Sequence, residues 1–286
     1  MGNYLIEKRL AAENPKLSNL ATESTFALKS ILKSYTAVFP DFTDHSMIHS
    51  LNVLAYCNRL IEEEQVAMLN ADECYVLIMS CYLHDTGMGI SVSDYEEFSN
   101  KIDFGSYFDT YDQNDVQRTI RDYHHEYSGL FARKYGDLFE IPSDEHLYAI
   151  VQTVRGHRKT DLFDETEYPD ICLADGNVIH TPYLAAVLRM ADEIDVAADR
   201  VSELLYDTSQ LTEQRDIIAF GTHYAIRRVE ITDDAIILQM SESGGDYMEH
   251  ILRLKNKIED TLRYCVSVCE QRTPFALRQS RVTIEE

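Results

Sequence analysis

The sequence of 286 residues has no run of about 18 or more consecutive apolar residues, the length that a helix needs to cross a membrane. Its first residues, MGNYLIEKRLAAENPK, carry charges where a secretory signal peptide would be apolar. Hydrophobic residues make up 45% of the chain, which is typical of a globular protein with a sizeable core. We therefore expect a globular cytoplasmic protein that does not enter a membrane.

Closely spaced cysteine pairs are also missing. The six cysteines form no CxxC motif and no dense framework of the kind that small disulfide-bonded domains use. Because they lie in apolar, helical contexts, we expect reduced thiols that are mostly buried. They are Cys57, Cys74, Cys81, Cys172, Cys265 and Cys269.

Basic residues are scarce, and they form no cluster. The chain has 26 lysines and arginines against 49 acidic residues, a formal net charge of −23. Binding of long nucleic acids depends on basic side chains that neutralise phosphates, so we do not expect a long nucleic acid as a partner. A small phosphorylated molecule remains compatible with this charge, because a pocket that holds divalent cations reverses the sign locally.

Apolar residues recur at helical spacing through the first two thirds of the chain. The expected helices cover residues 19–39, 47–64, 71–84, 113–135, 143–156 and 181–197, with short helices and a loop over 91–112. The texture then changes, because HYAIRRVEIT and DAIILQMS alternate as strands do on either side of a turn. We predict a β hairpin there, a long helix over 246–271 and a further short strand in the tail TPFALRQSRVTIEE.

The stretch CYLHDTGMG places His84 and Asp85 at the end of the most apolar expected helix. A buried ionised carboxylate is costly unless it is paired, hydrogen-bonded or bound to a metal. His49 lies on the same helix face as Val53, and Asp192 lies within the apolar stretch LRMADEID. Imidazole and carboxylate ligands suit several divalent metals. A lone inward histidine is more often a core residue and a helix-end aspartate is more often a cap, so the residues alone leave both interpretations open.

His49, the doublet of His84 and Asp85, and Asp192 follow one another on separate expected helices. In this order they resemble the H…HD…D signature of the HD superfamily of metal-dependent phosphohydrolases. The resemblance spans roughly residues 45–200. It implies a mainly α HD-domain helical bundle over residues 1–205, with a C-terminal extension over 206–286 made of a small β hairpin and a long terminal helix. It also implies one or two divalent ions, from Mn, Fe, Mg, Zn, Co or Ni. The implied ligands are His49, His84, Asp85 and Asp192 for a first ion, and Asp85, His124 and His157 for a second, with His125 as a less favoured substitute for His124.

The segments TDHSMIHS, HDTGM, RDYHHEYS, RGHRK and LRMADEIDVAADR are similar to the branch of this superfamily that is associated with Hsp90-like ATPases. Other branches fit less well. The doublet lacks the acidic pair that follows it in guanosine tetraphosphate hydrolases, and HHEYSG lacks the GYP element of cyclic-di-GMP phosphodiesterases. Neither of these substrates is therefore expected.

The resemblance implies hydrolysis of a small phosphorylated substrate, with nucleotides as the default class, by a metal-activated water. Asp85 and His45 are the expected catalytic residues, His45 as a proton donor or a hydrogen-bond partner of a metal ligand. Cationic side chains hold phosphates well, and those that flank His157 are the expected substrate contacts: Arg155, Arg158 and Lys159. Asp195 and Arg200 are expected to form a structural ion pair.

Two alternatives stay open at this point. A di-iron HD-type oxygenase uses the same ligand set, and a non-catalytic nucleotide-sensing module would keep the fold without the reaction. The residues of the C-terminal extension do not decide between a lid and a dimerisation element, so a homodimer is also compatible with the sequence.

Overall fold

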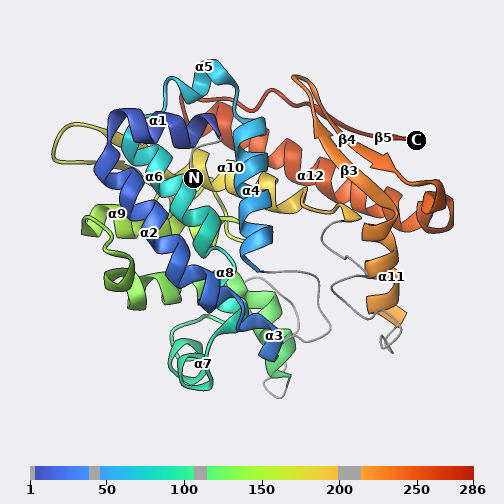
Figure 1. Cartoon of the computed structure of the whole chain (residues 1–286), viewed down its shortest axis with the longest axis horizontal. Helices are drawn as coiled ribbons and strands as arrows, with labels where there is room; N and C mark the ends of the chain where they lie inside the picture. The colour runs from blue at the N-terminus through green and yellow to red at the C-terminus, as the bar shows by residue number, and fades with distance from the viewer. Residues whose placement is uncertain (1–3, 39–45, 106–114, 199–213) are drawn as a thin grey trace.

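The computed structural model describes residues 4–38, 46–105, 115–198 and 214–286. These residues form a mainly helical protein with a small C-terminal sheet and a long terminal helix, as predicted (Figure 1). No described helix is both long enough and apolar enough to cross a bilayer. All six cysteines are free thiols, and five of them are buried, whereas Cys172 is exposed.

Helix α6 (Ala71–Leu83) forms the core of the helical part, and all 13 of its residues are buried. Its start is fixed by a capping box, in which the side chains of Asn70 and Glu73 each accept a hydrogen bond from the main-chain N–H of the other. Around it pack α1 (Leu5–Glu13), α2 (Pro15–Leu32), α4 (Met47–Leu60) and α9 (Asp144–Gly156). Because α6 is enclosed along its whole length, the residues that follow Leu83 also lie inside the protein.

Helices α8 (Val116–Tyr135), α9, α10 (Thr181–Glu193) and α4 meet near the C-terminal end of α6. Helix α8 packs beside α9, and α9 packs beside α10, which also contacts α4. The connecting elements are short: α3 (Tyr35–Val38), α5 (Glu63–Val66), η1 (Thr86–Gly89), α7 (Val92–Ser99), η2 (Gly136–Phe139) and an antiparallel pair of strands, β1 (Asp170–Cys172) and β2 (Val178–His180). Helices that are far apart in the sequence are thus brought to one region.

The C-terminal part contains the predicted hairpin, formed by β3 (Ile226–Ile231) and β4 (Ala235–Met240). The short strand expected in the tail is β5 (Arg281–Glu285), which pairs with β4 in parallel. Between β4 and β5 the chain runs through η5 (Glu242–Tyr247) and α12 (Met248–Arg272), and α12 packs along α10 (Figure 1). The predicted division between residues 205 and 206 lies outside the described residues and stays a prediction.

Some expected boundaries were wrong. The single helix expected over 19–39 begins earlier, at Pro15, and ends at Leu32, after which the separate helix α3 follows. Helix α1, strands β1 and β2, and α11 (Gln214–Tyr224) were not predicted. Helix α1 has three buried residues in nine, too short a pattern to stand out in the sequence.

Gly87 brings the turn after α6 into direct contact with α8. Its N–H donates to the hydroxyl of Ser128, at 2.8 Å. A β-carbon at this position would lie 2.4 Å from the carbonyl oxygen of His124 and 2.7 Å from the main-chain nitrogen of Ser128. These are backbone atoms of α8, which no rotamer change can move away, so a side chain here would push the two elements apart.

We therefore expect Gly87→Ala to lower the free energy of unfolding by roughly 1–3 kcal/mol, the usual cost of overpacking a tight contact. Gly245→Ala is the matched control, because nothing lies within 4 Å of a β-carbon at Gly245. Its effect should stay within about 0.5 kcal/mol. Urea denaturation measures both, and equal stability of the two variants would contradict the close contact between η1 and α8.

Candidate metal centre

Helix α6 delivers His84 and Asp85 to the interior. His84 is the C-cap of α6, and its Nδ1 lies 2.9 Å from the carbonyl oxygen of Cys81. His84 is fully buried, and Asp85 is only 3% exposed. A carboxylate at this depth needs a compensating partner.

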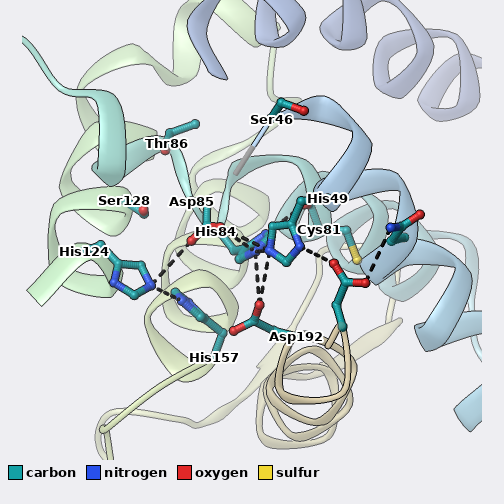
Figure 2. A network of polar contacts seen from close by, with 12 residues as sticks. Ser46, His49, Cys81, His84, Asp85, Thr86, His124, Ser128, His157 and Asp192 are labelled. Atoms are coloured by element: carbon teal, nitrogen blue, oxygen red, sulfur yellow. Dashed lines mark hydrogen bonds and ion pairs between the residues drawn. The ribbon is translucent and has the colours of Figure 1, made fainter. Parts of the chain in front are cut away.

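A first group of side chains meets around the Nε2 atom of His49, which comes from α4. This atom lies 3.1 Å from Nε2 of His84, 3.2 Å from Oδ2 of Asp85 and 3.2 Å from Oδ1 of Asp192, which comes from α10. Figure 2 shows the two imidazoles facing the carboxylate of Asp192. The four side chains expected to bind the first ion therefore converge.

A second group lies on the other side of Asp85 (Figure 2). The Nε2 atoms of His124 and His157, from α8 and the end of α9, are 2.9 Å apart. Nε2 of His124 lies 3.4 Å from Oδ1 of Asp85, whereas Oδ2 of Asp85 faces the first group. The two oxygens of one carboxylate thus face the two groups, as a bridging ligand requires.

The protonation of the imidazoles is set by their other ring nitrogen. Nδ1 of His84, His124 and His157 each contacts the main-chain carbonyl oxygen three residues earlier, at 2.9, 2.7 and 2.5 Å. A carbonyl oxygen only accepts hydrogen bonds, so Nδ1 carries the proton in each ring. Nδ1 of His49 contacts a carboxylate oxygen of Asp195, at 2.6 Å, with the same result. Nε2 is therefore the ring atom left in each imidazole to bind a cation, whether a metal ion or a proton.

Two facing Nε2 atoms repel each other unless a proton or a metal cation lies between them. Two other carboxylate-paired histidines lack a facing imidazole: His146 pairs with Asp72 at 2.9 Å, and His180 pairs with Glu73 at 2.7 Å. The paired Nε2 atoms around Asp85 thus fit divalent ions with nitrogen and oxygen ligands. His49, His84 and Asp85 in the first group, and Asp85, His124 and His157 in the second, are buried and have ligand atoms within 4.8 Å of one another, as a metal site requires. Asp192, which is partly exposed, adds a carboxylate oxygen to the first group as a fourth ligand atom, at 3.2 Å from Nε2 of His49.

The pKa values of the ligands differ between the two groups. Burial lowers the pKa of His157 to about 4. Burial, together with the charges of Arg158 and His157, holds the pKa of His124 well below its ordinary value. For His84, burial acts in the same direction, but the carboxylates of Asp85 and Asp192 outweigh it and raise the pKa well above its usual range. The second group is therefore ready to bind a cation at neutral pH, and the first holds a proton that a cation must displace.

Asp195 contacts a ligand of this site, and the sequence did not reveal this role. The expected pair with Arg200 stays a prediction, because Arg200 lies outside the described part of the chain. The fully buried carboxylate of Asp195 accepts from Nδ1 of His49 and, at 3.4 Å, from the side-chain amide of Asn52. A carboxylate in this place fixes the tautomer and ring orientation of a metal-binding histidine. The sequence signal that could have found it is the three-residue spacing between Asp192 and Asp195. This spacing puts both side chains on the same side of α10 and of the turn that follows it.

A cavity of about 760 Å³ opens beside the two groups. At one end it is lined by Asp85, His124, His157 and Asp192. Arg158 and Lys159, both expected substrate contacts, also line it, and Arg121 and Arg189 add two further cations. A volume of this size accommodates a nucleotide-sized ligand.

Other expected site residues lie elsewhere. Arg155 pairs with both oxygens of Glu126, at 2.8 Å each, and with Glu167 at 3.0 Å, and it does not line the cavity. His125 is fully buried and belongs to neither group of ligand atoms. His45 lies outside the described residues. The catalytic and substrate-binding roles given to these side chains by resemblance stay predictions.

The chain matches the HD-CE family over residues 39–263, more than half of its length. No curated protein matches it, and no solved structure does. The matched range contains every residue of the two groups and crosses the predicted division after residue 205. The association with Hsp90-like ATPases stays a prediction. With an HD-like match of this extent around a buried cluster of histidines and aspartates, the chain belongs to the HD-CE family.

Proposed function

We propose that this protein is a metal-dependent phosphohydrolase acting on a small phosphorylated substrate, most readily a nucleotide. The observation that carries the proposal is the pair of ligand groups sharing Asp85, with Nε2 atoms that face each other at 3.1 and 2.9 Å. Both groups lie beside a cavity lined by arginine and lysine side chains. This combination suits a reaction in which metal ions and a phosphoryl group meet.

In this proposal one ion would be held by His49, His84, Asp85 and Asp192. A second would be held by His124, His157 and Asp85. Bound divalent ions lower the pKa of a coordinated water and neutralise charge on phosphoryl oxygens. Asp195 keeps Nδ1 of His49 protonated, and the main-chain carbonyls do the same for the other three imidazoles.

Arg158 and Lys159 hold the substrate phosphate in this proposal. They follow His157 directly and line the cavity beside the ligand groups. Charge-assisted hydrogen bonds from such side chains are the usual means of holding phosphate groups. They also localise positive charge in a strongly acidic protein, so that an anionic substrate is attracted to the cavity rather than to the rest of the surface.

The two ligand groups predict a metal stoichiometry. Wild-type protein should bind two divalent ions per chain, and His124→Gln should bind one, because only the second group loses a ligand. His125→Gln is the matched control, since the neighbouring ring is equally buried but belongs to neither group. Elemental analysis after dialysis against Mn²⁺ measures the ratio. Loss of an ion from the His125 variant instead would contradict the assignment of His124.

A screen of nucleotides and phosphomonoesters tests the reaction itself. Wild-type protein loaded with Mn²⁺ should release inorganic phosphate or a nucleoside monophosphate. Asp85→Asn should reduce this rate at least about a thousandfold, because both ions lose their shared ligand. Asp72→Asn is the control, because Asp72 is also a buried aspartate and belongs to α6, but it pairs with His146.

Two outcomes of this screen would replace the proposal. Bound iron with oxygen uptake and no phosphate release would identify an oxygenase. Two bound metals without turnover of any phosphorylated compound, together with an intact cellular effect in Asp85→Asn, would identify a sensing module.

The pKa difference predicts opposite pH responses of the two groups. At neutral pH the raised pKa of His84 means that a proton must leave the first group before an ion binds. Affinity of this group should therefore rise about tenfold per pH unit between about pH 6 and pH 8, for one displaced proton. Since the pKa of His157 is about 4 and that of His124 is also lowered, affinity of the second group should stay nearly constant. Calorimetric titration of His124→Gln and His49→Gln isolates the two groups, and equal slopes would rule out this account.

A further inference from the structure

The turn that follows α9 carries three residues of the proposed site. His157 is the C-cap of α9, and Arg158 and Lys159 come directly after it. Residues 157–169 form turns and bends without a helix or strand. The backbone ladder of a helix or sheet therefore does not fix these side chains, and contacts from other elements must hold the turn in place.

Arg189 of α10 provides the first of these contacts. Its Nε donates to the carbonyl oxygen of Gly156, and its Nη2 donates to the carbonyl oxygen of Thr160, both at 2.7 Å. One guanidinium thus connects the two ends of the segment that contains His157. The same guanidinium lies 4.9 Å from the ring centroid of Tyr264, within the range of a cation–π contact.

Helix α12 provides the second set of contacts, and they converge on Leu162. The hydroxyl of Tyr264 accepts from the N–H of Leu162 at 2.7 Å and donates to Asp161 at 3.0 Å. Arg272 donates to the carbonyl oxygen of Leu162 at 2.8 Å and to that of Tyr168 at 2.9 Å. Both main-chain polar groups of the buried Leu162 are therefore satisfied by side chains of α12.

Helix α12 also forms a wall of the cavity. Leu254, Lys257, Thr261 and Tyr264 line it, opposite the metal ligands that come from the helical part. Lys257 is held there by an ion pair with Glu193, the residue after Asp192, at 2.8 Å. The contacts of α12 thus reach both the turn with His157 and the end of α10 with Asp192.

We propose that the C-terminal extension completes the site, and that Tyr264 is a positioning residue for the turn 157–162. Through its hydroxyl and its ring, Tyr264 holds Leu162 and Arg189, and these hold the segment that carries His157, Arg158 and Lys159. The extension is then a part of the site rather than a detachable lid. The part of this inference that concerns substrate affinity rests on the proposed function, whereas the part that concerns the turn and the second ion does not.

Tyr264→Phe tests this inference, because it removes the hydroxyl and keeps the ring against Arg189. Tyr135→Phe is the matched control: the Tyr135 hydroxyl also donates to an aspartate, Asp94, at 3.0 Å, but between α7 and α8 and away from the cavity. Three quantities are measured on each folded variant. They are the hydrogen exchange of the amides of residues 157–163, the affinity of the second ligand group for Mn²⁺, and the KM and kcat for the best substrate of the screen.

In Tyr264→Phe we expect faster exchange of the Leu162 amide, which loses its acceptor. We also expect Mn²⁺ affinity of the second group to fall about tenfold, at the lower end of the effects of outer contacts on metal sites, with the first ion unchanged. KM should rise more than kcat falls, because Arg158 and Lys159 contact the substrate phosphate. Tyr135→Phe should show none of these changes, even if it loses similar stability.

Arg272→Met is a second variant that acts on the same residue from the other side, by removing the partner of the Leu162 carbonyl. It should shift exchange and Mn²⁺ affinity in the same direction. Unchanged Mn²⁺ affinity in both variants, despite faster exchange at Leu162, would overturn the inference and leave the proposed function intact. Two bound ions, of which only the second binds more weakly in these variants, in a protein that hydrolyses nothing, would overturn the proposed function and leave the inference intact.

Discussion

The proton on Nδ1 of each site histidine is the constraint on which the rest of the site depends. In His84, His124 and His157 the acceptor is the carbonyl oxygen of the residue three positions earlier, a group that belongs to the same helix or its last turn. The tautomer is therefore fixed locally, before any tertiary contact is made. Packing of α4, α6, α8 and α9 then has only to bring the Nε2 atoms together. His49 is the exception, because its acceptor, Asp195, comes from beyond α10.

This arrangement concentrates negative charge where the protein has little water. Asp85 and Asp195 are buried, and Asp192 joins them at the edge of the cavity. The cavity beside them is lined by cations, among them Arg158 and Lys159, and also by the acidic side chains of Asp161, Glu193 and Asp260. In the proposed function, the carboxylates and imidazoles attract metal cations to the ligand groups, whereas Arg158 and Lys159 attract the phosphate of the substrate.

The sequence revealed the site well where the signal was local. The apolar run of α6 and the two glycines after it predicted a helix that ends at the doublet, and the position of His49 on the Val53 face predicted its inward direction. The resemblance supplied the pairing of these residues with His124, His157 and Asp192. It did not indicate that Arg155 pairs with the carboxylate of Glu126, 29 residues earlier and on a different helix. Contacts of this kind depend on how α8 and α9 pack, which no local pattern records. The same holds for Asp195, whose partner is 146 residues away.

The C-terminal extension shows why a division by texture need not be a division by function. Strand β5 pairs with β4 in parallel, so the chain between them must cross the sheet, and α12 is that crossover. At about 1.5 Å per residue, its 25 residues extend for roughly 37 Å. That length lets one helix pack on the sheet, run along α10 and still bring Tyr264 and Arg272 to the turn after α9. The family match, which continues to residue 263, agrees with this physical connection between the two parts.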